Sequence, residues 1–123
     1  YAHERKAGGV PIIQHQNVRY RLFHMFRKVE MARAMLLRSI TFNATAAKPA
    51  LQASTAAKVT VTQLAFEVAN EALQLFGGNG MTKEYPMEKL VRDTRACLIA
   101  DGCNEFLAIK GGGHLINPEL LSK

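Results

Sequence analysis

Between residues 16 and 46, apolar side chains recur at intervals of three and four positions for about eight helical turns. Side chains with this spacing share one face of an α-helix, so the segment predicts a single long amphipathic helix. The arginines of the segment lie mostly off that face. The apolar positions are Val18, Leu22, Met25, Phe26, Val29, Ala32, Leu36 and Ile40.

A second helix is predicted to begin at Pro49 and to run to about Phe76. Proline lacks a backbone N–H and suits the first turn of a helix, and the stretch AAKPA breaks the preceding pattern. The segment is rich in Ala, Ser and Thr, whose small side chains let neighbouring backbones approach closely. We therefore expect it to be central to a bundle. The glycines of GGNG, residues 77–80, end it, because glycine reaches the left-handed conformation that helix C-termini need.

Helical periodicity resumes after Pro86 and is interrupted at Asp101-Gly102, beyond which NEFLAI continues it. Three consecutive glycines follow, and each costs about 1 kcal/mol relative to alanine inside a helix. We therefore expect the last helix to end near Lys110. Since no segment shows strand-like alternation, the predicted fold class is all-α, an antiparallel up-down helical bundle with short connections.

Composition and charge exclude several classes of protein. The 123 residues make at most one domain, and 48% hydrophobic against 21% charged residues indicates a folded chain. No apolar run approaches the roughly 20 residues of a membrane-spanning helix, so no membrane span is predicted. The net charge of +6 comes partly from basic residues between positions 19 and 38. Because no aromatic-interleaved motif accompanies them, no nucleic-acid partner is predicted, and one or two arginines would equally serve a nucleotide diphosphate.

Cysteine and histidine usage predicts neither a disulfide framework nor a metal site. The two cysteines, Cys97 and Cys103, are too few for a disulfide scaffold, and the four histidines lack the spacing of zinc ligands. A reduced, intracellular and metal-free protein is the expectation.

Three segments occur in a characteristic order and spacing: YAHERKAGGVPIIQHQ, ALQLFGGNGMTKEYPMEKLVRD and IADG. Together they resemble the C-terminal helical domain of the acyl-CoA dehydrogenase family, flavoproteins that desaturate acyl thioesters. The resemblance covers nearly all of the chain and is most specific between Gln74 and Asp93. It implies that residues 1–123 form one C-terminal helical bundle domain and are a fragment of a longer protein.

The resemblance also implies the cofactor and the partners. It implies FAD as cofactor, an acyl-CoA substrate, an electron-transfer flavoprotein as electron acceptor, and a homo-oligomer, dimer or tetramer, formed through this domain. Proteins of this family lie in the bacterial cytoplasm or the mitochondrial matrix, and this segment does not choose between them.

Two segments carry most of the FAD contacts that the resemblance implies. In the family, the arginine of the ER segment contacts the flavin diphosphate of the neighbouring subunit, and Arg5 matches it; a guanidinium fork suits a diphosphate. His15 and Gln16 match a pair on the adenosine side. The turn around the adenosine-diphosphate end is matched by Gln74, Phe76, Gly77 and Gly78.

Each of these residues also has an ordinary structural interpretation: a surface arginine, a helix-end histidine, a helix C-cap. Tyr85, Arg92 and Asp93 match the family pattern too. For them we expect structural roles, namely a turn anchor and a buried or interhelical ion pair.

The stretch IADGCNEF aligns with the family motif EGTSQ, whose glutamate removes the substrate α-proton while a β-hydride leaves for the flavin. The alignment places Asp101 on this catalytic glutamate and Gly102 on the glycine beside the substrate. Cys103 and Glu105 fall on the threonine and glutamine that help to hold the flavin. Cys103 is a poorer hydrogen-bond donor than threonine, and Glu105 brings a negative charge.

Aspartate keeps the carboxylate but shortens its reach by one methylene. Aspartate occurs here in a subset of acyl-CoA dehydrogenases and in the related nitroalkane oxidases, so a nitroalkane oxidase-like flavoprotein is an alternative. Another alternative is a non-catalytic helical assembly module. Asp101 itself has a structural interpretation as the N-cap of the following helix.

Overall fold

The computed structural model describes residues 1–117 and 119. A small antiparallel hairpin opens the chain, with Lys6 opposite Pro11. Short 3-10 turns follow the hairpin and precede the third helix. The elements are β1 (Lys6–Ala7), β2 (Val10–Pro11), η1 (Ile12–Gln14), α1 (Gln16–Thr45), α2 (Leu51–Phe76), η2 (Gly77–Met81), α3 (Met87–Cys97) and α4 (Asn104–Ile116).

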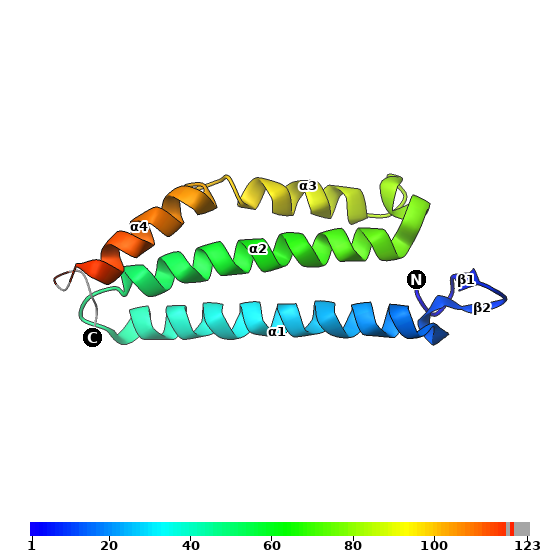
Figure 1. Ribbon diagram of the computed structural model, residues 1–123, viewed down its shortest axis with the longest axis horizontal. Coiled ribbons are helices and arrows are strands. Elements are labelled where there is room, and N and C mark those ends of the chain that lie inside the picture. Colours follow the sequence, from blue (N-terminus) through cyan, green and yellow to red (C-terminus); the bar gives the residue numbers. More distant parts are fainter. Residues whose placement is uncertain (118, 120–123) are drawn as a thin grey trace.

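The helices form an elongated antiparallel bundle with α2 in the middle (Figure 1). Helix α1 runs along one side of α2, and α3 and α4 follow each other along the opposite side, all three in contact with α2. This arrangement confirms the predicted all-α antiparallel bundle, and α1 and α2 lie within two residues of their predicted bounds. The hairpin was not predicted, because two-residue strands are too short to show alternation.

Small residues let α2 contact helices on both of its sides. Ala57 and Ala69 of α2 are buried, as is Ala50 just before it. A methyl side chain leaves room for the neighbouring backbone, so α1 can approach from one side while α3 and α4 approach from the other. The prediction that the second helix is central is therefore confirmed.

The prediction that the last helix ends near Lys110 is wrong, since α4 continues through the three glycines to Ile116. A Cβ atom at Gly111 would lie 3.1 Å from Cγ2 of Thr55 on α2, tighter than ordinary packing. The missing side chain thus lets α4 lie close against α2. Packing between the helices outweighs the low helix propensity of glycine.

The expected buried or interhelical pair of Arg92 and Asp93 is also wrong. Arg92 pairs with Glu88 and Asp93 pairs with Lys89, each four residues away along the exposed side of α3. Both positions face water, where ion pairs within one helix contribute little to the stability of the fold. Tyr85, by contrast, is half-buried and packs edge-on against Tyr1 and Phe76, as expected for a turn anchor.

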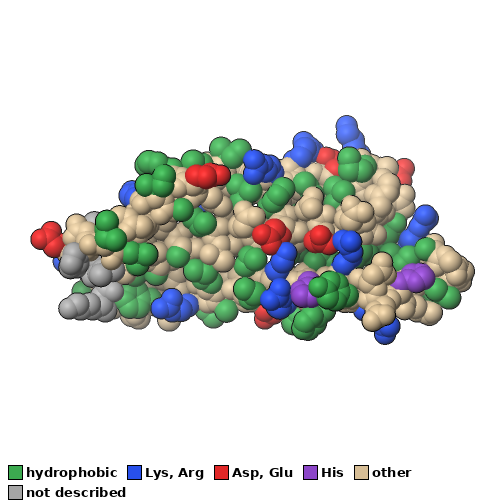
Figure 2. Space-filling model, in the orientation of Figure 1, with side chains coloured by type: hydrophobic (Ala, Val, Ile, Leu, Met, Phe, Trp, Pro, Cys, Tyr) green, Lys and Arg blue, Asp and Glu red, His purple; other side chains and the backbone are tan. Residues whose placement is uncertain are grey.

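Large apolar side chains remain exposed on α1. Phe23, Phe26, Leu37 and Ile40 are each more than half exposed, and Figure 2 shows apolar side chains distributed over much of the face in view. Among the described residues, none of the helices combines the length and apolarity that crossing a bilayer requires.

Candidate functional site

One pocket lies where the N-terminal segment meets the end of α2. It has a volume of about 270 Å³ and brings together four of the residues predicted to contact FAD: Arg5, Phe76, Gly77 and Gly78. Tyr1, Ile12, Leu75 and Asn79 complete its lining. Residues more than seventy positions apart in the sequence therefore form a single hollow.

Tyr1 fastens the N-terminal segment to α2. Its ring stacks on that of Phe76, with centroids 4.1 Å apart, and its hydroxyl donates to the Phe76 carbonyl oxygen at 3.0 Å. The side-chain amide of Asn79 donates in turn to the Tyr1 hydroxyl at 3.2 Å. The sequence offered an aromatic residue at each end of this contact, but no signal that the two would meet.

The backbone on the α2 side of this pocket is open. Gly77 has φ 60°, and nothing lies within 4 Å of where a Cβ would stand at Gly77 or Gly78. Within residues 1–117, the Arg5 guanidinium makes no hydrogen bond or ion pair. An unpaired guanidinium and open glycine backbone line the same pocket, and this combination has the chemistry to bind a diphosphate such as that of FAD.

The other predicted contacts near this pocket lie outside its lining. His15 is half-buried, and its Nε2 lies 3.0 Å from the carbonyl oxygen of Ala7, which holds the hairpin against the start of α1. Gln16 is the first residue of α1 and is exposed, and Gln74 is exposed near the end of α2. The structure thus gives His15 a local structural contact and leaves both glutamine side chains accessible.

Asp101 lies in the connection between α3 and α4, on the side of α2 away from α1 (Figure 1). It has φ 55° and is the one non-glycine residue with positive φ in the described part of the chain. Gly102 follows with φ 93°. Asp101 is exposed, and neither its carboxylate nor its backbone N–H has a hydrogen-bond partner among residues 1–117 and 119.

The interpretation of Asp101 as an N-cap is wrong. Helix α4 begins at Asn104, so its N-cap position is Cys103, and no side chain caps this helix end. Cys103 is half-buried and forms no disulfide within the described residues, and Glu105 is exposed in the first turn of α4, where an acidic group suits the helix dipole. Both lie beside Asp101, and neither lines the pocket around Arg5.

The connection between α3 and α4, residues 98–103, is called the Asp101 turn. Lys58 of α2 contacts both ends of this turn. Its ammonium group donates to the carbonyl oxygens of Cys97 at 3.1 Å and Gly102 at 2.8 Å, and to Oδ1 of Asn104 at 2.8 Å. Lys58 was not predicted as a site residue, because in the sequence it is only a lysine within a run of small residues.

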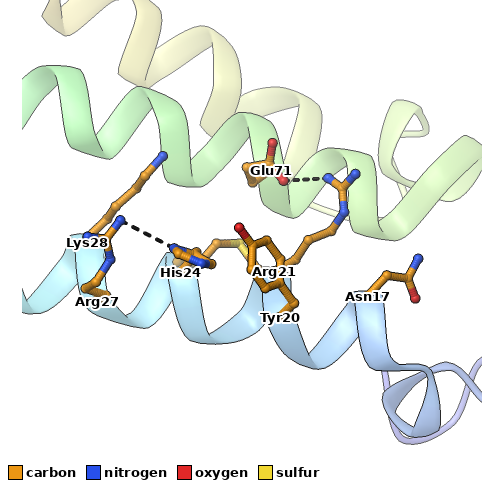
Figure 3. Close-up of a pocket in the computed structure, with 8 residues that line it drawn as sticks. Asn17, Tyr20, Arg21, His24, Arg27, Lys28 and Glu71 are labelled. Carbon is orange, nitrogen blue, oxygen red and sulfur yellow. Dashed lines mark hydrogen bonds and ion pairs between the residues drawn. The ribbon is translucent and has the colours of Figure 1, made fainter.

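A third cluster, shown in Figure 3, lies along the contact between α1 and α2. Arg21 pairs with Glu71, and Lys28 pairs with Glu67 at 2.7 Å, so each ion pair joins the two helices. Hydrogen bonds from Lys28 and Gln63 hold the pKa of Glu67 below its ordinary value. Some basic residues of α1 thus form ion pairs with α2. Figure 2 shows charged side chains of both signs grouped along the contact between the two helices.

The described residues thus form an all-α bundle in which an arginine and an open glycine turn line one pocket, and an aspartate with positive φ lies in a separate connection. A sequence model described as "Acyl-CoA dehydrogenase, C-terminal domain" matches residues 1–112. The chain belongs to the acyl-CoA dehydrogenase family.

Individual relatives agree with this assignment. The mouse mitochondrial short-chain specific acyl-CoA dehydrogenase is 32% identical over 116 residues, which cover 94% of this chain and 28% of that protein. The structure of butyryl-CoA dehydrogenase from Megasphaera elsdenii matches with a TM-score of 0.89 and 30% identity, covering 95% of this chain and 30% of that one. A FAD complex of PigA matches with a TM-score of 0.85 and 25% identity, covering 94% and 30%. The chain therefore spans less than a third of the length of these relatives.

Proposed function

We propose that this chain contributes the catalytic base and part of the FAD site to an enzyme that dehydrogenates an acyl-CoA thioester between its α and β carbons. The observation that carries the proposal is the state of Asp101. The resemblance aligns it with the family's glutamate; in the structure it has a left-handed backbone conformation and makes no hydrogen bond within the described residues. Backbone strain is concentrated at functional sites.

In the proposed reaction, the Asp101 carboxylate accepts the proton from the α-carbon, and a hydride leaves the β-carbon, so the C–C bond becomes a double bond. The unused backbone N–H of Asp101 is available to polarise the thioester carbonyl by a hydrogen bond, which stabilises the charge that develops there. A carboxylate is a stronger base when water is excluded from it. Asp101 is exposed in this domain, so the bound substrate and further protein would have to cover it.

FAD is the cofactor in this proposal, and when bound it supplies the acceptor for the two electrons that leave the substrate. Arg5 would hold its diphosphate, and the glycine backbone at Gly77 and Gly78 would lie along its adenosine-diphosphate end. Gln16, Gln74 and His15 remain proposed contacts on the adenosine side. Cys103 and Glu105 would lie near the flavin beside Asp101, and Gly102 beside the substrate.

The separation of the Arg5 pocket from the Asp101 turn supports a homo-oligomer. The two regions lie on different parts of the bundle and share no lining residue. If Arg5 serves the flavin of a neighbouring subunit, as the family resemblance implies, each flavin draws on two copies of this domain. We propose an electron-transfer flavoprotein as the acceptor that reoxidises the enzyme.

The proposal is tested with Asp101→Asn in the flavin-loaded enzyme that contains this chain. Bleaching of the flavin by butyryl-CoA without oxygen should slow by about 10²–10⁴-fold, the usual contribution of a general base, while the FAD content stays unchanged. Asp93→Asn is the matched control, because Asp93 is exposed and paired only along α3. Bleaching at the normal rate in Asp101→Asn would refute the assignment.

A nitroalkane oxidase-like activity is the second candidate, favoured by the aspartate at this position. It uses the same base on a carbon acid but passes the electrons to oxygen. Nitroethane and a series of acyl-CoA esters, each assayed with and without oxygen, separate the two activities. Turnover of nitroethane that consumes oxygen, with no bleaching by any acyl-CoA, would decide for the second candidate.

A further inference from the structure

We propose that Lys58 is a positioning residue that holds the Asp101 turn in the conformation needed for proton abstraction; this inference rests on the function proposed above. Lys58 is half-buried on α2 and faces the connection between α3 and α4. An ammonium group has three N–H donors. All three have acceptors here, the carbonyl oxygens of Cys97 and Gly102 and Oδ1 of Asn104.

The three acceptors lie on both sides of Asp101 in the sequence. Cys97 is the last residue of α3, Gly102 directly follows Asp101, and Asn104 is the first residue of α4. One nitrogen atom on a neighbouring helix therefore fixes the start and the end of the turn. Charge-assisted hydrogen bonds are about twice as strong as neutral ones, and a cation is favoured at the C-terminal end of a helix such as α3.

Asn104 extends the same attachment. Its amide nitrogen lies 3.3 Å from the Val59 carbonyl oxygen and 3.0 Å from the Thr62 hydroxyl, both on α2. The start of α4 is thus bound to α2 through Lys58 and Thr62. Both attachments are made by residues around Asp101, and its own carboxylate remains free among the described residues.

This attachment bears on catalysis because aspartate has a short side chain. With only two side-chain torsions, the position of the carboxylate follows the backbone closely. A displacement of 1 Å in a reacting group can slow a reaction by about 100-fold. Asp101 and Gly102 both have positive φ, which costs a residue with a side chain about 1–2 kcal/mol, so contacts on both sides of Asp101 help to hold this conformation.

The test uses Lys58→Met in the flavin-loaded enzyme, because methionine keeps the apolar length and removes the donors. Flavin bleaching at saturating butyryl-CoA should slow by about 100-fold, with FAD content unchanged and with little change in the butyryl-CoA concentration that gives half the maximal rate. Lys58→Arg, which keeps charge and donors, should recover much of the rate. Lys110→Met, at an exposed lysine of α4, should behave like the unmodified enzyme.

Amide hydrogen exchange of residues 98–104 gives a second measurement that does not depend on the reaction, and it should be faster in Lys58→Met. Should that variant not fold, Asn104→Ala removes one of the three acceptors and should slow bleaching by a smaller factor.

Normal bleaching in folded Lys58→Met, or equal slowing in Lys58→Arg and Lys58→Met, would overturn the inference while the proposed function stands. If the unmodified enzyme is not bleached by any acyl-CoA, the proposed function fails, and the catalytic role of Lys58 fails with it.

Discussion

Asp101 and Gly102 are consecutive residues with positive φ, at 55° and 93°. The left-handed region costs about 1–2 kcal/mol for residues with a side chain, and aspartate is among the few that enter it routinely. Glutamate, the usual residue in the family motif, is not among the residues that enter this region readily. The shorter carboxylate therefore suits this backbone conformation, and its reduced reach would be compensated by where the turn places it.

Gly102→Ala should lower the free energy of unfolding by about 1–2 kcal/mol. The added Cβ would keep an unfavourable φ and would also lie 3.2 Å from Cδ2 of Leu107. Gly9→Ala is the matched control, because Gly9 has φ 82° but nothing within 4 Å of its Cβ position. Urea denaturation at one protein concentration measures the free energy of unfolding of both variants. A loss at Gly102 no larger than that at Gly9 would show that the contact with Leu107 is unimportant.

At the residue scale, the family motif predicted Asp101 as the base, and nothing in the sequence indicated that Lys58 would contact the turn around it. Asp101 was predicted because its neighbours match a motif that is local in the chain. Lys58 was not, because Gly102 lies 44 residues away and only the packing of α3 and α4 on α2 brings them together. The pairing of Arg92 was mispredicted for the opposite reason: a partner one helical turn away, Glu88, was available.

The three glycines of α4 differ in their surroundings, although the sequence presents them as a uniform run. A Cβ at Gly111 would lie 3.1 Å from Thr55, whereas nothing lies within 4 Å of that position at Gly112. Gly112→Ala should therefore stabilise the domain by about 0.5–1 kcal/mol, because alanine is the better helix former. Gly111→Ala should gain less or lose stability. Thermal unfolding followed by circular dichroism compares them, and equal gains would contradict the close packing of α4 on α2.

The ion pair between Lys28 and Glu67 joins α1 to α2 and should make the stability of the domain depend on pH. Hydrogen bonds from Lys28 and Gln63 lower the pKa of Glu67 from its ordinary 4.5. A carboxyl whose pKa is lower in the folded state stabilises the fold above its unfolded pKa, and this is lost as the pH falls through the folded pKa.

Glu67→Gln should accordingly reduce the melting temperature slightly at pH 7, with the difference disappearing as the pH falls below about 4. The effect should be small, because both side chains are partly exposed. Glu30→Gln is the control, since Glu30 pairs with Arg33 within α1 and joins no helices. A difference from the unmodified protein that stays constant between pH 7 and pH 3 would contradict the role of the Glu67 carboxylate.

Elements were predictable where the pattern was long. The apolar spacing over some thirty positions located α1, and small residues bounded by proline and glycine located α2. The end of α4 was not predictable, because glycine propensity is local and the contact with Thr55 is tertiary. The hairpin was not predicted, because each strand has only two residues.

For the molecule as a whole, the two candidate regions are incomplete in different ways. The Arg5 pocket offers a cation and open backbone but little apolar enclosure, and the Asp101 turn offers a carboxylate with no cover. The two regions lie on different parts of the bundle and share no lining residue. The order of the family motifs placed candidate residues in both regions, and it could not predict this separation.

The exposed face of α1 leads to a prediction for the 123-residue chain by itself. Phe23, Phe26, Leu37 and Ile40 are 57–66% exposed, and their spacing places them on one side of the helix. They form two apolar pairs, Phe23 with Phe26 and Leu37 with Ile40, and the exposed Glu30–Arg33 ion pair lies between them. Exposed apolar clusters of this kind are usually covered by another protein surface. The chain should therefore self-associate, and it should be colourless and inactive because each candidate region is incomplete.

Light scattering after size exclusion should give a mass that is a multiple of 13.6 kDa. The double variant Phe23→Lys, Leu37→Lys should shift the chain towards the monomer, because it places positive charges on the associating face. Ile109→Lys, which changes a 76% exposed residue of α4, should leave the mass unchanged. A monomeric chain would show that the α1 face is not an interface between copies. A yellow preparation that dehydrogenates acyl-CoA would show that this domain holds FAD and substrate without the further sequence, more than two thirds of the length, that its relatives possess.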